Sequence, residues 1–104
     1  MSWNRDQLEF DRGVKLLRQS TDDDLRESSL NFLKRSYQFD SCYQWDWAGF
    51  PILNMPEDVV AFQEILFRCK PTVIIETGVP WGGSIALAAS IMSLYEPNGS
   101  ILGI

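Results

Sequence analysis

The chain has 104 residues, 45% of them hydrophobic, and a net charge of −5 from 9 basic and 14 acidic side chains. This composition predicts an ordered globular domain or part of one, and it disfavours nucleic acid and anionic membranes as partners. Because there is no histidine, these residues contain neither a Ser-His-Asp nor a Cys-His catalytic site, and no histidine-ligated metal.

The N-terminus shows no signal peptide, and the longest apolar stretch, residues 85–95, is shorter than the ~20 residues of a bilayer span. Cys42 and Cys69 lie outside any CxxC pattern, so we expect two buried free thiols rather than a disulfide or a metal site. We therefore expect a cytoplasmic protein without a membrane span.

Residues 1–42 are predicted to form an N-terminal helical segment. Apolar residues recur at helical spacing within residues 4–19, which predicts a first helix. Thr21 or Asp22 is suited to cap a second helix that continues to about Phe39. Nothing in the two helices suggests chemistry, so we interpret them as a cap or an interaction segment.

Residues 40–55 are aromatic and have no helical period, and we interpret them as an ordered loop. Tyr43, Trp45, Trp47 and Phe50 either line a pocket or pack under a sheet. Packing is the favoured interpretation, because each aromatic side chain can bury a large area.

The rest of the chain alternates between helix and strand. Pro56 starts an amphipathic helix over residues 57–69, and the β-branched run at 73–75 predicts a strand buried on both faces. An apolar helix over 83–94 follows, and another strand starts at about 101. A strand–helix–strand order of this kind makes parallel neighbours, so the predicted class is α/β.

A glycine turn joins the first of these strands to the following helix, and it carries the candidate site residues. Gly78 permits a sharp turn, and Gly82 and Gly83 allow a ligand to approach the main chain at the helix N-terminus, where Ser84 adds a hydroxyl. Glu76 ends an apolar strand, so its carboxylate must pair, reach water or meet a cationic ligand. The alternative is that Glu76 is a structural acid that accepts hydrogen bonds from N–H groups of the turn. We favour a role for Glu76 in a ligand site.

The common nucleotide motifs do not fit this turn. Gly83 stands where the Walker A motif requires lysine, and Pro80 replaces the second glycine of the dinucleotide pattern. S-adenosylmethionine fits better, because its methionyl end carries both an ammonium group for Glu76 and a carboxylate for the helix N-terminus.

These motifs, in this order, resemble the cephalosporin hydroxylase family, whose members have the class I S-adenosylmethionine-dependent methyltransferase fold. The resemblance covers about residues 43–104. The matching positions are Trp47, Gly49, Pro51, Ile52, Pro56, Asp58, Gln63, Glu64, Lys70, Pro71, Ile74, Ile75, Glu76, Thr77, Gly78, Gly82, Gly83, Ser84, Gly103 and Ile104.

The resemblance implies that residues 43–104 are the first, incomplete part of a Rossmann-like cofactor-binding domain, cut off after its second strand. It implies O-methylation of a small-molecule hydroxyl on a natural product, sugar or lipid-linked substrate. A divalent metal such as Mg²⁺ and the ribose-binding acid would then lie beyond Ile104. The implied cofactor-binding residues are Glu76, Thr77, Gly78, Gly82, Gly83 and Ser84, with no catalytic residue assigned.

The segment Val79-Pro80-Trp81 departs from the family pattern, and Trp81 is expected to narrow or shield the pocket. Two alternatives stay open. One is a non-catalytic fragment or interaction module, inactive alone, whose exposed sheet edge favours a homo-oligomer. The other is a component of an oxidative hydroxylase, which would need an iron site outside these residues.

Overall fold

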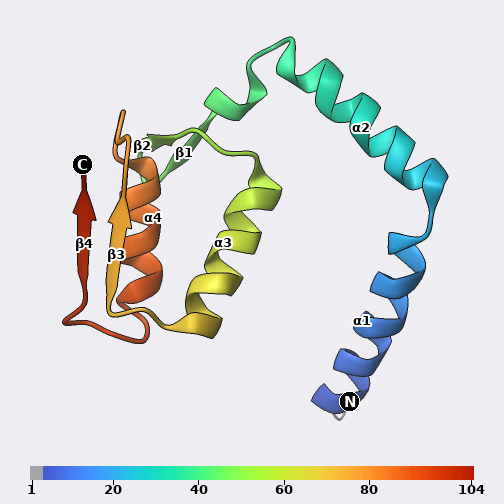
Figure 1. The fold of residues 1–104 in the computed structure, drawn as a ribbon, viewed down its shortest axis with the longest axis horizontal. Helices are drawn as coiled ribbons and strands as arrows, with labels where there is room; N and C mark the ends of the chain where they lie inside the picture. Colours follow the sequence, from blue (N-terminus) through green and yellow to red (C-terminus); the bar gives the residue numbers. More distant parts are fainter. Residues whose placement is uncertain (1–3) are drawn as a thin grey trace. The chain divides into compact units, whose positions relative to one another are not determined.

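A computed structural model describes residues 4–104, which divide into two compact units. The N-terminal unit ends at Ser36, and the C-terminal unit is Tyr37–Ile104. The N-terminal unit contains helix α1 (Arg5–Ser20) and all but the last residue of helix α2 (Asp23–Tyr37), the blue and cyan part of Figure 1. No helix within residues 4–104 is both long and apolar enough to cross a membrane.

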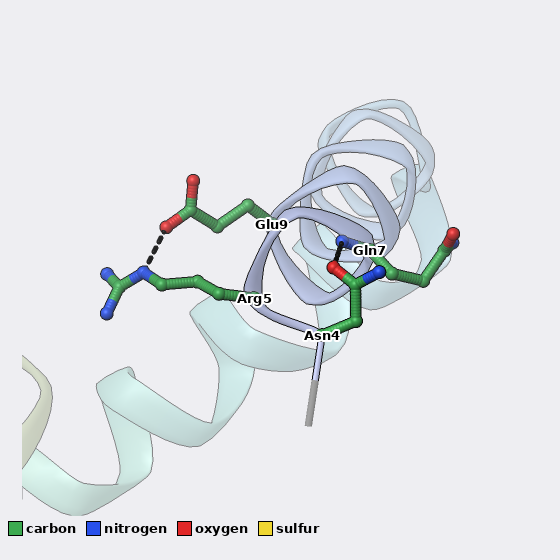
Figure 2. A network of polar contacts seen from close by, with 4 residues as sticks. All are labelled: Asn4, Arg5, Gln7 and Glu9. Atoms are coloured by element: carbon green, nitrogen blue, oxygen red, sulfur yellow. Dashed lines mark hydrogen bonds and ion pairs between the residues drawn. The ribbon is translucent and has the colours of Figure 1, made fainter. Parts of the chain in front are cut away.

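The starts of α1 and α2 are set by side-chain caps. The Asn4 side chain accepts a hydrogen bond from the Gln7 backbone N–H at 3.1 Å, and Arg5 pairs with Glu9 one turn further on (Figure 2). A cap of this kind stabilises a helix by about 1 kcal/mol. For α2 the cap is Asp22, which accepts from the Leu25 N–H at 2.9 Å. Both predicted helices are therefore present.

The C-terminal unit begins with a short helical turn, η1 (Ser41–Tyr43), and an antiparallel hairpin of β1 (Trp45–Trp47) and β2 (Phe50–Ile52). The prediction of an ordered loop over residues 40–55 was wrong at these two strands. Ala48 and Gly49 both have positive φ, 49° and 84°, which gives a tight turn whose twist matches the hairpin. An alanine in that conformation is not a recognisable turn signal.

The four aromatic residues of η1 and the hairpin that were considered for packing are less buried than expected. Trp47 is half-buried, and its indole N–H donates to the Ser90 hydroxyl of α4 (Gly83–Met92) at 3.0 Å. Tyr43, Trp45 and Phe50 stay exposed. The packing interpretation therefore holds for Trp47 and was wrong for the other three.

Helix α3 (Pro56–Cys69), strand β3 (Val73–Glu76), helix α4 and strand β4 (Ser100–Gly103) complete the unit. Strands β3 and β4 are parallel neighbours (Figure 1), and Val73 pairs with Ser100 and Glu76 with Gly103. Their ladder continues past Glu76, because the Gly78 N–H donates to the Ile104 carbonyl at 2.8 Å. A mixed α/β class is thus confirmed.

The core of the C-terminal unit lies where the hairpin, α3 and α4 meet. Its buried residues are Ile52, Met55, Leu66, Leu87, Ala88 and Met92. The expectation that strand 73–75 is buried on both faces was wrong, since Val73 and Ile75 are 59% and 62% exposed. Only the alternate residue, Ile74, is half-buried, so one side of the β3–β4 pair is covered and the other is open.

The two cysteines also differ from the expectation. Both thiols are free, as predicted, but Cys42 is only half-buried and Cys69 is exposed. Cys69 is the last residue of α3, where the helix turns into the connection to β3 and leaves the core.

Tyr95 connects the end of α4 to the start of β3. Its hydroxyl donates to the Pro71 carbonyl at 2.9 Å, and its ring meets Phe67 edge to face at 6.3 Å. Desolvation, and then the charge of Glu96, raise the pKa of Tyr95 above its ordinary value of 10.0. Folding therefore favours the neutral phenol, whose stabilising contribution is complete below pH 10.0 and is lost as the pH rises through the raised pKa.

This linkage predicts that the wild-type chain loses more stability than Tyr95→Phe when the pH is raised above 10.0. Urea unfolding at a series of alkaline pH values measures the difference. Tyr37→Phe, at an exposed position, is the matched control and should follow the wild type. Parallel loss of stability in wild type and Tyr95→Phe would contradict the assigned role of this hydroxyl.

Candidate functional site

The carboxyl end of β3 and the first turn of α4 bring Glu76 and Ser84 together. The Ser84 hydroxyl donates a hydrogen bond to the Glu76 carboxylate. Both side chains are half-buried. The pairing that an acid at the end of an apolar strand requires is therefore supplied in part by the chain itself.

Two glycines of the intervening turn have backbones that other residues rarely adopt. Gly78 and Gly82 have φ values of 75° and 82°, so the chain turns sharply after β3 and again before α4. The first backbone bond of α4 runs from the Ala86 N–H to the Gly82 carbonyl, at 2.9 Å. The amide N–H groups between them thus have no partner within the helix.

Glycine is required at position 83 for a different reason, which is close packing. It is buried, and a Cβ at this position would lie 2.1 Å from the Pro51 carbonyl oxygen. Only a glycine allows the first turn of α4 to lie directly against β2. The sequence suggested ligand approach as the reason for this glycine, and the structure adds packing against the hairpin.

A pocket of about 260 Å³ opens beside this turn. Five of the six candidate residues line it, and Thr77 does not. The five are Glu76, Gly78, Gly82, Gly83 and Ser84. Thr77 instead lines a neighbouring pocket of about 370 Å³, next to Phe62 and Ile74, and Glu76 and Ser84 border that pocket as well.

Three residues that sequence reasoning did not assign to the site complete the wall of the smaller pocket: Pro51, Leu53 and Asn54. Pro51 is the middle residue of β2, and Leu53 and Asn54 lie between β2 and α3. Asn54 also borders the neighbouring pocket. Asn54, Glu76 and Ser84 are therefore shared by the walls of both pockets. A signal did exist, because Pro51 belongs to the pattern that carries the family resemblance.

Pro80 and Trp81 line the same pocket from the turn. Trp81 is 56% exposed and therefore lies at the rim of the pocket. Whether it narrows or shields the ligand remains a prediction. Because Trp81 lines the pocket, its indole is a suitable fluorescence reporter for binding.

The metal prediction referred to residues after Ile104. Within residues 4–104, no three His, Cys, Asp or Glu side chains are grouped so that they could hold a metal ion. The chemistry of the described site is that of a carboxylate, a hydroxyl and backbone amides.

Comparison with known proteins gives one family match. A family model described as rhamnosyl O-methyltransferase/CmcI matches residues 40–104, which include the hairpin, the turn and every residue of the candidate site. No curated protein and no solved structure matches the chain.

Proposed function

Because the chain belongs to the rhamnosyl O-methyltransferase/CmcI family, we propose that it serves S-adenosylmethionine-dependent methyl transfer to a hydroxyl of a small molecule. The family match confirms the resemblance to cephalosporin hydroxylases that the motifs of residues 43–104 indicate. The family is one of O-methyltransferases. The cofactor, the acceptor class and the residue roles below are our proposals.

We propose that β3, α4 and β4 are the first strand–helix–strand unit of a Rossmann-like sheet. The parallel register of β3 and β4 and the glycine turn between β3 and α4 support this. In this proposal residues 43–104 are the cofactor-binding part and residues 1–42 a separate helical segment. The site then lies at the carboxyl end of a parallel strand, where ligands bind in α/β sheets.

The observation that carries the cofactor proposal is the Glu76–Ser84 pair beside the unpaired amides of α4. An ammonium group suits the Glu76 carboxylate, and a carboxylate suits the amide N–H groups at the helix start. The methionyl end of S-adenosylmethionine carries an ammonium group and a carboxylate on the same carbon atom, so it can meet Glu76 and the helix start together. The pocket of about 260 Å³ lies just below the ~300–1,000 Å³ typical of a whole small-molecule site, which suits one end of the cofactor.

When bound, S-adenosylmethionine supplies an electrophilic methyl group on its sulfonium. The described residues bind and orient its methionyl end, and methyl transfer depends strongly on such positioning. Glu76 holds the ammonium, the first amides of α4 hold the carboxylate, and Trp81 and Pro80 cover one side of the pocket.

Isothermal titration of the full chain with S-adenosylmethionine tests the proposal, with ATP as the comparison ligand. We expect saturable binding of S-adenosylmethionine and none of ATP, because the triphosphate carries no ammonium group and would place negative charge next to Glu76. Absence of binding at millimolar S-adenosylmethionine, or equal binding of ATP, would overturn it.

A further inference from the structure

We infer that Ser84 is a positioning residue that acts through Glu76, so that the pair receives the ammonium group of the ligand and not its carboxylate. This rests on the proposed function and deepens it, because it assigns to Ser84 a role that the proposed function leaves open. A serine at a helix start would otherwise be expected to donate its proton to a ligand anion.

The number of hydrogen-bond donors and acceptors on Glu76 and Ser84 determines which ligand group the pair can bind. A serine hydroxyl has one proton, and the Ser84 hydroxyl gives it to the Glu76 carboxylate. An ionised carboxylate only accepts. The remaining lone pairs of both residues are therefore acceptors, and the pair offers the pocket no donor.

The charge of Glu76 has no partner of opposite sign in the described chain. Among residues 4–104 the salt bridge found is Arg5 with Glu9, far along the sequence in the N-terminal unit. Ser84 compensates the carboxylate as a neutral donor, and a neutral donor leaves the negative charge in place. An ammonium ligand would supply the missing cation and would find acceptors on both residues.

Glu76 lies between two pockets, so the orientation of its carboxylate decides which pocket receives the negative charge. Glu76, Ser84 and Asn54 border both the pocket beside the glycine turn and the neighbouring pocket beside Phe62. The carboxylate can therefore direct its charge to either side. The bond from Ser84 holds one carboxylate oxygen, which reduces the rotamer freedom that the side chain would lose on binding.

A ligand without a carboxylate separates this role from direct anion binding. We compare the affinities of S-adenosylmethionine and decarboxylated S-adenosylmethionine, which keeps the ammonium group, for wild type and Ser84→Ala by isothermal titration. Loss of one hydrogen bond to a charged group should weaken both ligands by about tenfold. If Ser84 donated to the ligand carboxylate, the decarboxylated ligand would bind both proteins equally, and that result would overturn the inference.

Two variants complete the experiment. Ser84→Thr keeps the hydroxyl and should restore the affinity for both ligands, whereas a merely structural loss in Ser84→Ala would not be rescued by a bulkier side chain. Ser93→Ala removes the hydroxyl of a serine just after α4 that borders neither of the two pockets, and it should bind like wild type. Wild type that binds neither ligand would refute the proposed function itself. Wild type that binds S-adenosylmethionine no better than Ser84→Ala would refute only the role of Ser84.

Discussion

Gly83→Ala is expected to destabilise the C-terminal unit by about 3 kcal/mol, the upper part of the range for overpacking a closely packed site. The added Cβ would lie 2.1 Å from the Pro51 carbonyl oxygen and 2.8 Å from the Ile52 Cα. These are backbone atoms, so the clash can be relieved only by moving α4 away from β2. Urea unfolding followed by tryptophan fluorescence measures the loss.

Gly13→Ala is the matched control for this substitution. Gly13 lies inside α1, and a Cβ there would meet nothing within 4 Å. Alanine in a helix interior is more favourable than glycine by about 1 kcal/mol, so this variant should gain helix stability. If Gly83→Ala were as stable as wild type, the close contact between the start of α4 and the hairpin would be contradicted.

Glu76→Gln is expected to weaken S-adenosylmethionine binding by about 10- to 100-fold, the loss of a hydrogen bond to a charged partner. Glutamine keeps the size of the side chain and an oxygen that can accept from Ser84, but it removes the negative charge that faces the ammonium group. The fold should therefore persist, and the loss should appear in affinity alone.

The control for this variant is Glu64→Gln, an exposed acid of α3 that does not border the pocket. It changes the net charge of the chain by the same amount and should bind like wild type. Titration of both variants gives the comparison. Equal affinity of Glu76→Gln and wild type would show that the carboxylate does not receive the ligand, whatever the fold.

The helices and the parallel strand pair could be predicted from the sequence because their signals are local. Pro56 and an apolar periodicity indicate α3, and a run of alanine and other apolar residues indicates α4. The glycine turn could be predicted for the same reason, since Gly78 and Gly82 adopt the positive φ that favours glycine. The hairpin was missed because Ala48 takes a positive φ without a sequence signal.

The remaining differences are non-local. A β-branched run indicates a strand, but its burial depends on which elements cover each face, and Ile75 lies on the open one. The bond between Ser84 and Glu76 crosses the whole turn. Asn54 reaches the pocket only because the hairpin packs on α4. No residue pattern short of the assembled unit reveals such contacts.

The most direct test of the central claim is an amide NMR spectrum of the full chain titrated with S-adenosylmethionine. We predict that the perturbed amides gather around the pocket between the hairpin and the glycine turn, at Asn54, Gly78, Gly82, Gly83 and Ser84. Perturbations confined to α1 and α2, for example at the groove formed by Lys15, Arg18 and Leu25, would contradict it.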